Sequence, residues 1–202
     1  MLSSLIRNFA AEYKLSVMKR FNNTIQLIKL SQEHTVAFKE EMQEAFQHGF
    51  QSYSQRNEEE QDNKNQWQVS PDKDFYQSLE AEGAEAYEAV NEKGQRVGGA
   101  IITVNGNEGE LAFLYVKVGV QSKGIGQAIW KAIETMHPEI EVWETCTPYF
   151  DRRNIHFYIN RCGFHAVEFF NEHHPDPNMP EQFDQEDGLF KFEKRMHKQY
   201  II

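Results

Sequence analysis

The sequence of 202 residues predicts one mixed α/β domain of the α+β class, with a mostly antiparallel sheet and one parallel strand pair. Three observations predict it. Short alternating strands joined by hairpin turns fill the middle of the chain, one amphipathic helix then connects two strands, and no repeat divides the sequence. A helical crossover between two strands of one sheet makes that pair parallel.

The first elements are a strand and a helix. Residues 1–20 are expected to be an N-terminal extension to a domain at 21–202. They contain neither a continuous apolar core nor a signal cleavage site, so a secretory signal is not expected. Alternation at 24–30 predicts a strand, and Ser31 is a candidate N-cap for a helix that runs to about Phe50.

The remaining elements follow from periodicity and turn residues. Residues 52–70 are rich in Glu, Gln and Asn, which predicts a solvated loop. We expect helices at 71–82, 124–137 and 154–161, with Gly163 near the C-cap of the last. We expect strands at 84–90, 97–104, 110–118, 140–145, 165–170 and 189–196.

Composition limits the partners of the protein. Lys and Arg number 21 against 31 Asp and Glu, and the net charge of −10 disfavours nucleic acid and mildly favours cationic molecules. Two cysteines, Cys146 and Cys162, indicate a reducing compartment, so we expect a cytoplasmic protein. No apolar run is long enough to span a membrane. His173 and His174 lack a third ligand at a set spacing, so no metal is expected.

The most informative segment lies between the strand at 110–118 and the helix at 124–137. It reads Gln121-Ser122-Lys123-Gly124-Ile125-Gly126-Gln127-Ala128. Glycines let backbone N–H groups converge, and a helix N-terminus adds partial positive charge, so such a turn can hold a pyrophosphate. Gly124 would allow close approach, Gly126 would let the first helical turn pack, and Lys123 would add a charge.

The same spacing has other interpretations. It is not a Walker A loop, because Gly-Lys-Ser/Thr is absent, and it is not G-x-G-x-x-G. A glycine pair at the start of a helix is also often only structural. The spacing alone therefore leaves both a phosphate site and a structural turn open.

Two motifs together resemble the GNAT N-acetyltransferase family. Residues 114–134, LYVKVGVQSKGIGQAIWKAIE, are similar to its acyl-CoA-binding motif, Gln/Arg-x-x-Gly-x-Gly/Ala after a strand. Residues 151–164, DRRNIHFYINRCGF, resemble its second motif, a helix carrying Phe-Tyr followed by Gly-Phe. The motifs lie in the right order and elements, and the resemblance covers 24–197. It implies a GNAT-like central mixed sheet, helices on both faces and acetyl-CoA as co-substrate.

The resemblance also implies where acetyl-CoA binds. The parallel strands would splay apart, and the backbone of Val116 and Val118 would hold the pantetheine arm. The pyrophosphate would rest on the segment from 121 to 127, that is on Gln121, Lys123, Gly124, Ile125, Gly126 and Gln127. The family often has Pro at the position of Val118 and Gly at that of Ser122. A common Asn is replaced by Asp151, so either Asp151 or Asn154 contacts coenzyme A.

Proton transfer needs an acid and a base. Direct attack by an amine expels a thiolate, and Tyr158 matches the family position whose tyrosine can protonate it. The alternative for Tyr158 is packing on the sheet. Glu110 is the candidate base, whereas other carboxylates, a water relay and loss to solvent stay open. Those other carboxylates are Glu144, Glu40, Glu41 and Glu44.

The expected function is transfer of an acetyl group from acetyl-CoA to a primary amine of a small molecule or peptide, in a ternary complex. A non-catalytic acyl-CoA-binding or sensing module of the same fold is the alternative. A toxin that acetylates aminoacyl-tRNA is disfavoured by the net charge of −10. Exposed backbone on the last strand, 189–196, would let a homodimer form.

Overall fold

The computed structural model describes residues 25–54, 72–121, 124–177 and 188–196. Its strands are β1 (Gln26–Lys29), β2 (Ala84–Val90), β3 (Arg96–Asn105), β4 (Glu108–Val116), β5 (Val142–Pro148), β6 (His165–Phe170) and β7 (Leu189–Arg195). Its helices are the 3₁₀ turn η1 (Gln32–His34), α2 (Thr35–Ser54), α3 (Asp72–Glu80), α4 (Ile125–Met136), α5 (Arg152–His156) and the π-helical turn η4 (Phe157–Cys162).

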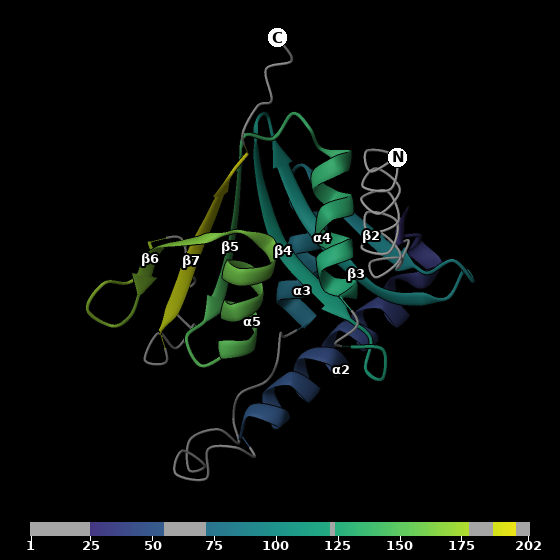
Figure 1. Ribbon diagram of the computed structural model, residues 1–202, viewed down its shortest axis with the longest axis horizontal. Helices are drawn as coiled ribbons and strands as arrows, with labels where there is room; N and C mark the ends of the chain where they lie inside the picture. Colours follow the sequence, from purple (N-terminus) through teal and green to yellow (C-terminus); the bar gives the residue numbers. More distant parts are fainter. Residues whose placement is uncertain (1–24, 55–71, 122–123, 178–187, 197–202) are drawn as a thin grey trace, which may run out of the picture.

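The strands form one sheet in the order β1-β2-β3-β4-β5-β7-β6. Every neighbouring pair is antiparallel except β4 and β5, which α4 connects as a crossover. Figure 1 shows β4 and β5 close together at one end and diverging toward the other. The predicted α+β class, with one parallel pair in a mostly antiparallel sheet, is therefore confirmed.

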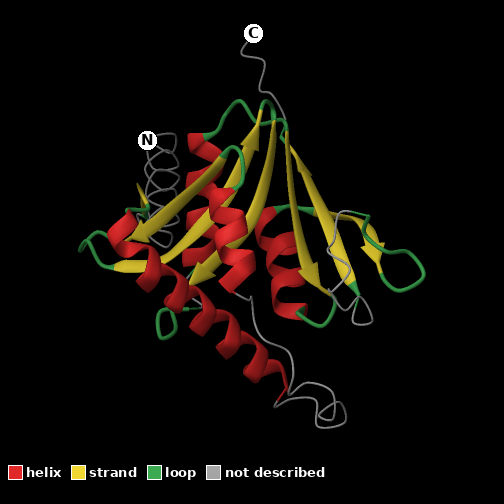
Figure 2. Cartoon of the chain, turned by 180° about the vertical axis from the view of Figure 1, so that it is seen from behind, coloured by secondary structure: helices red, strands yellow, loops and turns green. Residues whose placement is uncertain are grey.

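Helices cover the two faces of the sheet. Figure 1 shows α4 and α5 on the near face, and Figure 2 shows α2 from the opposite side. The face under α4 and α5 has a core that includes Trp130 and Trp143, and the face under α2 and α3 has one that includes Phe38 and Phe75. These four side chains are fully buried. Apolar stripes on α2 and α4 thus hold the sheet between two helical layers.

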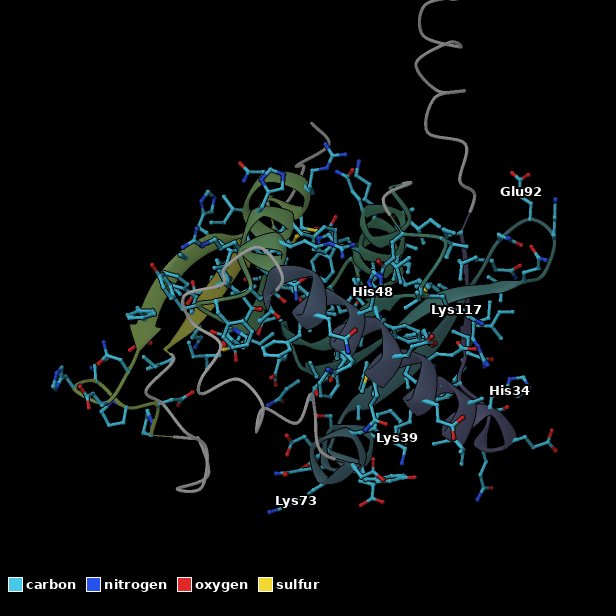
Figure 3. All side chains as sticks on the ribbon, turned by 90° about the horizontal axis from the view of Figure 1, so that it is seen from below. His34, Lys39, His48, Lys73, Glu92 and Lys117 are labelled. Carbon is cyan, nitrogen blue, oxygen red and sulfur yellow. The ribbon has the colours of Figure 1, made fainter. Side chains whose placement is uncertain are left out.

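An ion-pair cluster fixes α2 over the ends of β3 and β4. Glu41 of α2 lies 2.8 Å from Arg96 Nε and 2.7 Å from Lys117 Nζ, and it also accepts a hydrogen bond from Tyr115. Arg96 pairs as well with Glu88 of β2. Figure 3 labels Lys117, which lies beneath α2 just past β4. Burial opposes ionisation of Glu41, but the two cations outweigh it and hold its pKa below the ordinary value.

Several predicted boundaries are wrong. Ser31 precedes η1 and its side chain caps nothing, while α2 begins at Thr35 and runs to Ser54, into the predicted loop. The strand predicted at 110–118 ends at Val116. The helix predicted at 154–161 is α5 followed by η4, because one turn widens to π geometry. Residues 1–20 and Lys123 lie outside the described residues.

The last strand in the chain is not at an edge of the sheet. β7 pairs with β5 on one side and with β6 on the other, which leaves β1 and β6 as the edges. The backbone of β7 is therefore already used within the sheet. The expectation that this strand pairs with a second copy of the chain is wrong.

Candidate active site

The parallel pair β4 and β5 separates after three residue pairs. These pairs are Glu108 with Val142, Gly109 with Trp143 and Glu110 with Glu144. Beyond them, Leu111–Val116 of β4 and Thr145–Pro148 of β5 do not pair with each other, and we call the space between these two stretches the split.

A β-bulge lies at the start of the split. Ile101 and Ile102 of β3 are opposite Phe113 and Leu111, so Ala112 is an extra residue in β4. A bulge bends its strand and increases the local twist, which turns β4 away from β5.

The backbone of β4 supplies polar groups to the split. The N–H of Lys117 donates to the carbonyl of Val97 on β3, at 2.9 Å. Because neighbouring residues of a strand direct their backbone groups to opposite sides, those of Val116 face the split. The Nε2 of Gln121 donates to the Val116 carbonyl at 3.2 Å. Val118 lies past the end of β4 and packs on the core under α2.

The first amides of α4 have no acceptor within the helix. Gly124 has a left-handed backbone with φ of 77°, and the first helical bond runs from the Ala128 N–H to the Gly124 carbonyl. The N–H groups of Ile125, Gly126 and Gln127 precede that bond and have no acceptor within the helix. A Cβ on Gly126 would lie 3.2 Å from the Phe157 ring, so this glycine permits close packing of α4 on η4. These amides belong to the turn that the sequence analysis predicts to hold a pyrophosphate.

Tyr158 lies on η4 at the apex of the split. Its ring packs against Phe164 and Phe192, and the residue is 7% exposed. The Thr145 side chain acts on this hydroxyl and favours its ionised form, and the Thr145 hydroxyl itself donates to the Leu111 carbonyl at 2.9 Å. Burial raises the pKa of Tyr158 well above its ordinary value, so the phenol is protonated at neutral pH. The ring of Tyr158 therefore packs in the core, as one interpretation of the sequence expected, while its hydroxyl still carries a proton that it could donate.

The π-helical turn and the cap of α5 place Tyr158. The N–H of Gly163, whose φ is 81°, donates to the Tyr158 carbonyl five residues earlier, in the predicted C-cap region. Such turns are rare and occur frequently at functional sites. At the start of α5 the Asp151 carboxylate accepts from the Asn154 N–H at 2.9 Å. Asp151 is thus used as a helix cap. Nearby, Gln127 Nε2 donates to the Arg161 carbonyl at 2.6 Å and joins α4 to η4.

Glu110 lies beside the same apex on the opposite face of the sheet. Its neighbours Gly109 and Leu111 face the core under α4, so Glu110 faces the side of α2. Burial raises the pKa of Glu110, and the nearby Glu144 raises it further, whereas Lys191 lowers it. Lys191 Nζ lies 2.9 Å from the Glu144 carboxylate. A carboxylate with a raised pKa, reachable from solvent, suits a general base.

Cys146 follows Glu144 on the same face of β5. The residue is exposed at the surface, but partial desolvation of its thiol, together with Glu110 and Asp176, raises the pKa to about 12. The thiol is therefore protonated at neutral pH and is a weak nucleophile. This arrangement favours reactions that do not pass through an acyl-cysteine.

The sequence interpretation missed Thr145 and the pairing of Glu144 with Lys191. The sequence does contain a signal for Thr145. Thr145 and Thr147 follow Trp143 at every second position of β5, so they share its buried face although they are polar. Of the other candidate bases, Glu41 is held by Arg96 and Lys117, and Glu40 and Glu44 are exposed on α2.

Two further observations concern the described part of the chain. It has no group of three or more His, Cys, Asp or Glu side chains that could hold a metal ion. None of its helices is both long enough and apolar enough to cross a membrane. His174 instead pairs with Glu168 and stacks on Phe170.

The sequence is similar to known acetyltransferases. Residues 37–164 match the acetyltransferase (GNAT) family. The chain is 42% identical over 139 residues to the uncharacterized protein YrkN of Bacillus subtilis strain 168. The aligned region covers 64% of this chain and 75% of that protein.

Solved structures share the fold at low identity. One is the PaiA N-acetyltransferase of Thermoplasma acidophilum in complex with coenzyme A (TM-score 0.57, 16% identity, 85% of this chain and 99% of that chain). Another is the ribosomal-protein-S18-alanine N-acetyltransferase of Escherichia coli (TM-score 0.60, 13%, 88% and 99%). A third is the spermidine N-acetyltransferase of Vibrio cholerae in complex with CoA and spermine (TM-score 0.59, 9%, 86% and 96%). With the family match over residues 37–164, the sheet and the split, the chain belongs to the GNAT acetyltransferase family.

Proposed function

We propose that the protein is an N-acetyltransferase that moves the acetyl group of acetyl-CoA to a primary amine of a small molecule or peptide. The observation that carries the proposal is the arrangement around the split. Its wide end adjoins the first amides of α4, which have no acceptor within the helix, and its apex is flanked by Tyr158 on one face and Glu110 on the other. A donor with a phosphate end and a thioester end fits such a site.

The residues of the split fit coenzyme A. The amides of Ile125, Gly126 and Gln127 hold the pyrophosphate, Gly124 allows its close approach, and Gln121 and the charge of Lys123 contribute to its binding. The backbone groups of Val116 and Val118 form hydrogen bonds with the pantetheine arm. The arm replaces Gln121 as the hydrogen-bond donor to the Val116 carbonyl. Asn154, on the first turn of α5, contacts the arm from the other side. When bound, acetyl-CoA supplies the acetyl thioester.

Glu110 acts as the general base. A primary amine is mostly protonated at neutral pH, so one proton must leave the nitrogen before it attacks. Glu110 accepts that proton and releases it to solvent, and its raised pKa makes it a better base than an ordinary surface carboxylate.

Tyr158 acts as the general acid. The bond between the acetyl carbon and sulfur breaks as the amide forms, and Tyr158 gives its proton to the leaving sulfur. The nitrogen loses its second proton to solvent, and Tyr158 regains one from solvent, so one proton is released per turnover. The buried phenol holds its proton until a strongly basic thiolate develops beside it.

The transfer is direct. Cys146 is a thiol on the same face as Glu110, but its pKa of about 12 leaves almost no thiolate at neutral pH. A protonated Cys146 supports attack by the amine on acetyl-CoA itself, with both bound in one ternary complex.

The acceptor is a cationic amine. The face of Glu110 also carries Glu144, and the chain has a net charge of −10. Two neighbours in fold are named for amines of different size, spermidine and the alanine of a ribosomal protein, so the fold accommodates small molecules and peptides.

A thiol-release assay tests the proposal. Purified protein is mixed with acetyl-CoA and a panel of polyamines, amino acids and short peptides, and free CoA is measured alongside the mass of the amine product. We expect acetylation of at least one amine, and a loss of about 10²-fold or more in kcat for Tyr158→Phe with acetyl-CoA binding retained. Tight binding of acetyl-CoA with no product from any amine would support a sensing module instead.

A further inference from the structure

The side chain of Thr145 closes the apex of the split. Leu111 lies one residue beyond the last pair of β4 and β5, where the parallel ladder no longer provides its carbonyl with a partner from β5. Thr145 Oγ1 donates to this carbonyl at 2.9 Å, and Thr145 is 2% exposed. The hydroxyl thus replaces a missing ladder bond at the point where the strands separate.

The same hydroxyl fixes the direction of the bond to Tyr158. A threonine hydroxyl has one proton and two acceptor lone pairs, and the proton of Thr145 lies on Leu111. With its proton on Leu111, the Thr145 oxygen can offer Tyr158 only an acceptor lone pair. The ring of Tyr158 is held by Phe164 and Phe192, so the hydroxyl has one defined position at the apex.

We propose that Thr145 is a positioning residue for acetyl transfer. At rest its hydroxyl oxygen accepts a hydrogen bond from the Tyr158 hydroxyl. Once Tyr158 has given its proton to sulfur, the Thr145 hydroxyl donates a hydrogen bond to the Tyr158 oxygen. The inference rests on the proposed function. When Tyr158 has given up its proton, the Thr145 hydroxyl rotates from the Leu111 carbonyl to the phenolate oxygen. A proton from solvent then restores Tyr158, and Thr145 returns to Leu111.

Thr145 acts on Tyr158 in the opposite direction to the surroundings. Burial raises the pKa of Tyr158 most, and Cys162 on η4, Asp151 at the start of α5 and Cys146 on β5 raise it further, whereas Thr145 lowers it. A hydrogen bond to an ionised oxygen is about twice as strong as one between neutral groups, so Thr145 contributes most when Tyr158 is charged.

Kinetics of three variants test the role. Thr145→Val keeps the shape but removes the hydroxyl, Thr145→Ser keeps the hydroxyl, and Thr147→Val is the matched control at the next buried threonine of β5. We expect Thr145→Val to lower kcat about 10- to 100-fold with KM for acetyl-CoA unchanged, and the other two to stay near wild type. Equal losses in Thr145→Val and Thr145→Ser, or no loss in either, would overturn the role.

A titration that needs no turnover provides the second readout. Tyrosines are replaced by 3-fluorotyrosine, whose phenol ionises at lower pH, and the Tyr158 signal in the ¹⁹F NMR spectrum is assigned with Tyr158→Phe. We expect the pKa of fluorinated Tyr158 to be higher in Thr145→Val than in wild type, and unchanged in Thr145→Ser. Identical titrations would show that Thr145 does not donate to this oxygen. If the wild-type protein acetylates no amine, the proposed function fails, and the titration still decides the hydrogen bond.

Discussion

Glu110 of β4 and Glu144 of β5 are direct neighbours in the last pair before the two strands separate. Both side chains face the side of α2, while Lys191 of β7 reaches Glu144 at 2.9 Å. Burial raises the pKa of Glu110, the like charge of Glu144 raises it further, and Lys191 lowers it. One strand pair therefore forms the apex of the split and contributes to the basicity of the carboxylate beside it.

Glu110→Gln should remove the general base. We expect kcat to fall about 10²-fold or more, because the amine then loses its proton only to solvent. Binding of acetyl-CoA, measured by calorimetry, should be unchanged, since Glu110 and the start of α4 lie at opposite ends of β4. Glu108→Gln, two residues earlier on the same face, is the control and should retain activity. A Glu110→Gln enzyme with wild-type kcat would exclude this base.

The acid limb of the pH profile should respond to the neighbours of Glu110. Activity needs ionised Glu110, so kcat/KM rises with pH through its pKa, which lies above the ordinary glutamate value. Glu144→Gln removes a like charge and should move this limb to lower pH. Lys191→Met removes a cation and should move it to higher pH. The test is to measure kcat/KM against pH for both variants with the same amine. Shifts of the acid limb in the same direction would contradict the assignment of this limb to Glu110.

Gly124→Ala should weaken donor binding. Gly124 and Gly94 both have left-handed backbones, with φ of 77° and 72°, and a Cβ at either meets nothing within 4 Å. Alanine should therefore cost each site a similar stability, about 1–2 kcal/mol. Only Gly124 lies at the start of α4, so only Gly124→Ala should raise the Kd of acetyl-CoA. Equal affinities for the two variants would argue against a pyrophosphate at this turn.

Glu41→Gln should loosen α2. The change leaves Arg96 and Lys117 without their shared carboxylate, which we expect to lower the free energy of unfolding by about 1–3 kcal/mol. Because the pKa of Glu41 is lowered in the folded protein, this contribution is present above the ordinary carboxyl pKa. It is lost as pH falls through the lowered folded-state pKa.

Urea unfolding at neutral and acidic pH measures this effect. The difference between wild type and Glu41→Gln should shrink in acid. The control is Glu40→Gln, an exposed neighbour on α2, which should unfold like wild type at both pH values.

Much of this architecture could be predicted from local sequence patterns. Alternation predicted the strands, and the apolar stripe on α4 together with the glycines at 124 and 126 predicted the crossover and the turn that begins it. Those signals are local, because they depend on residues within one element.

The other features arise from contacts between distant segments. The split depends on a bulge at Ala112 and on pairing that stops at Glu144, and neither leaves a periodic signal. The hydrogen bonds of Thr145 join β5, β4 and η4, and the widened turn at Phe157–Cys162 interrupts an otherwise ordinary helical pattern. The position of β7 between β5 and β6 is likewise set by tertiary pairing, which is why its expected edge role was wrong.

The amides at the start of α4 are the groups on which the account depends, and a two-dimensional ¹⁵N–¹H NMR titration with coenzyme A observes them directly. We predict that the signals of Ile125, Gly126 and Gln127 shift most and saturate together with that of Val116. Saturable binding that leaves these four amides unmoved, or no binding at millimolar coenzyme A, would contradict the account.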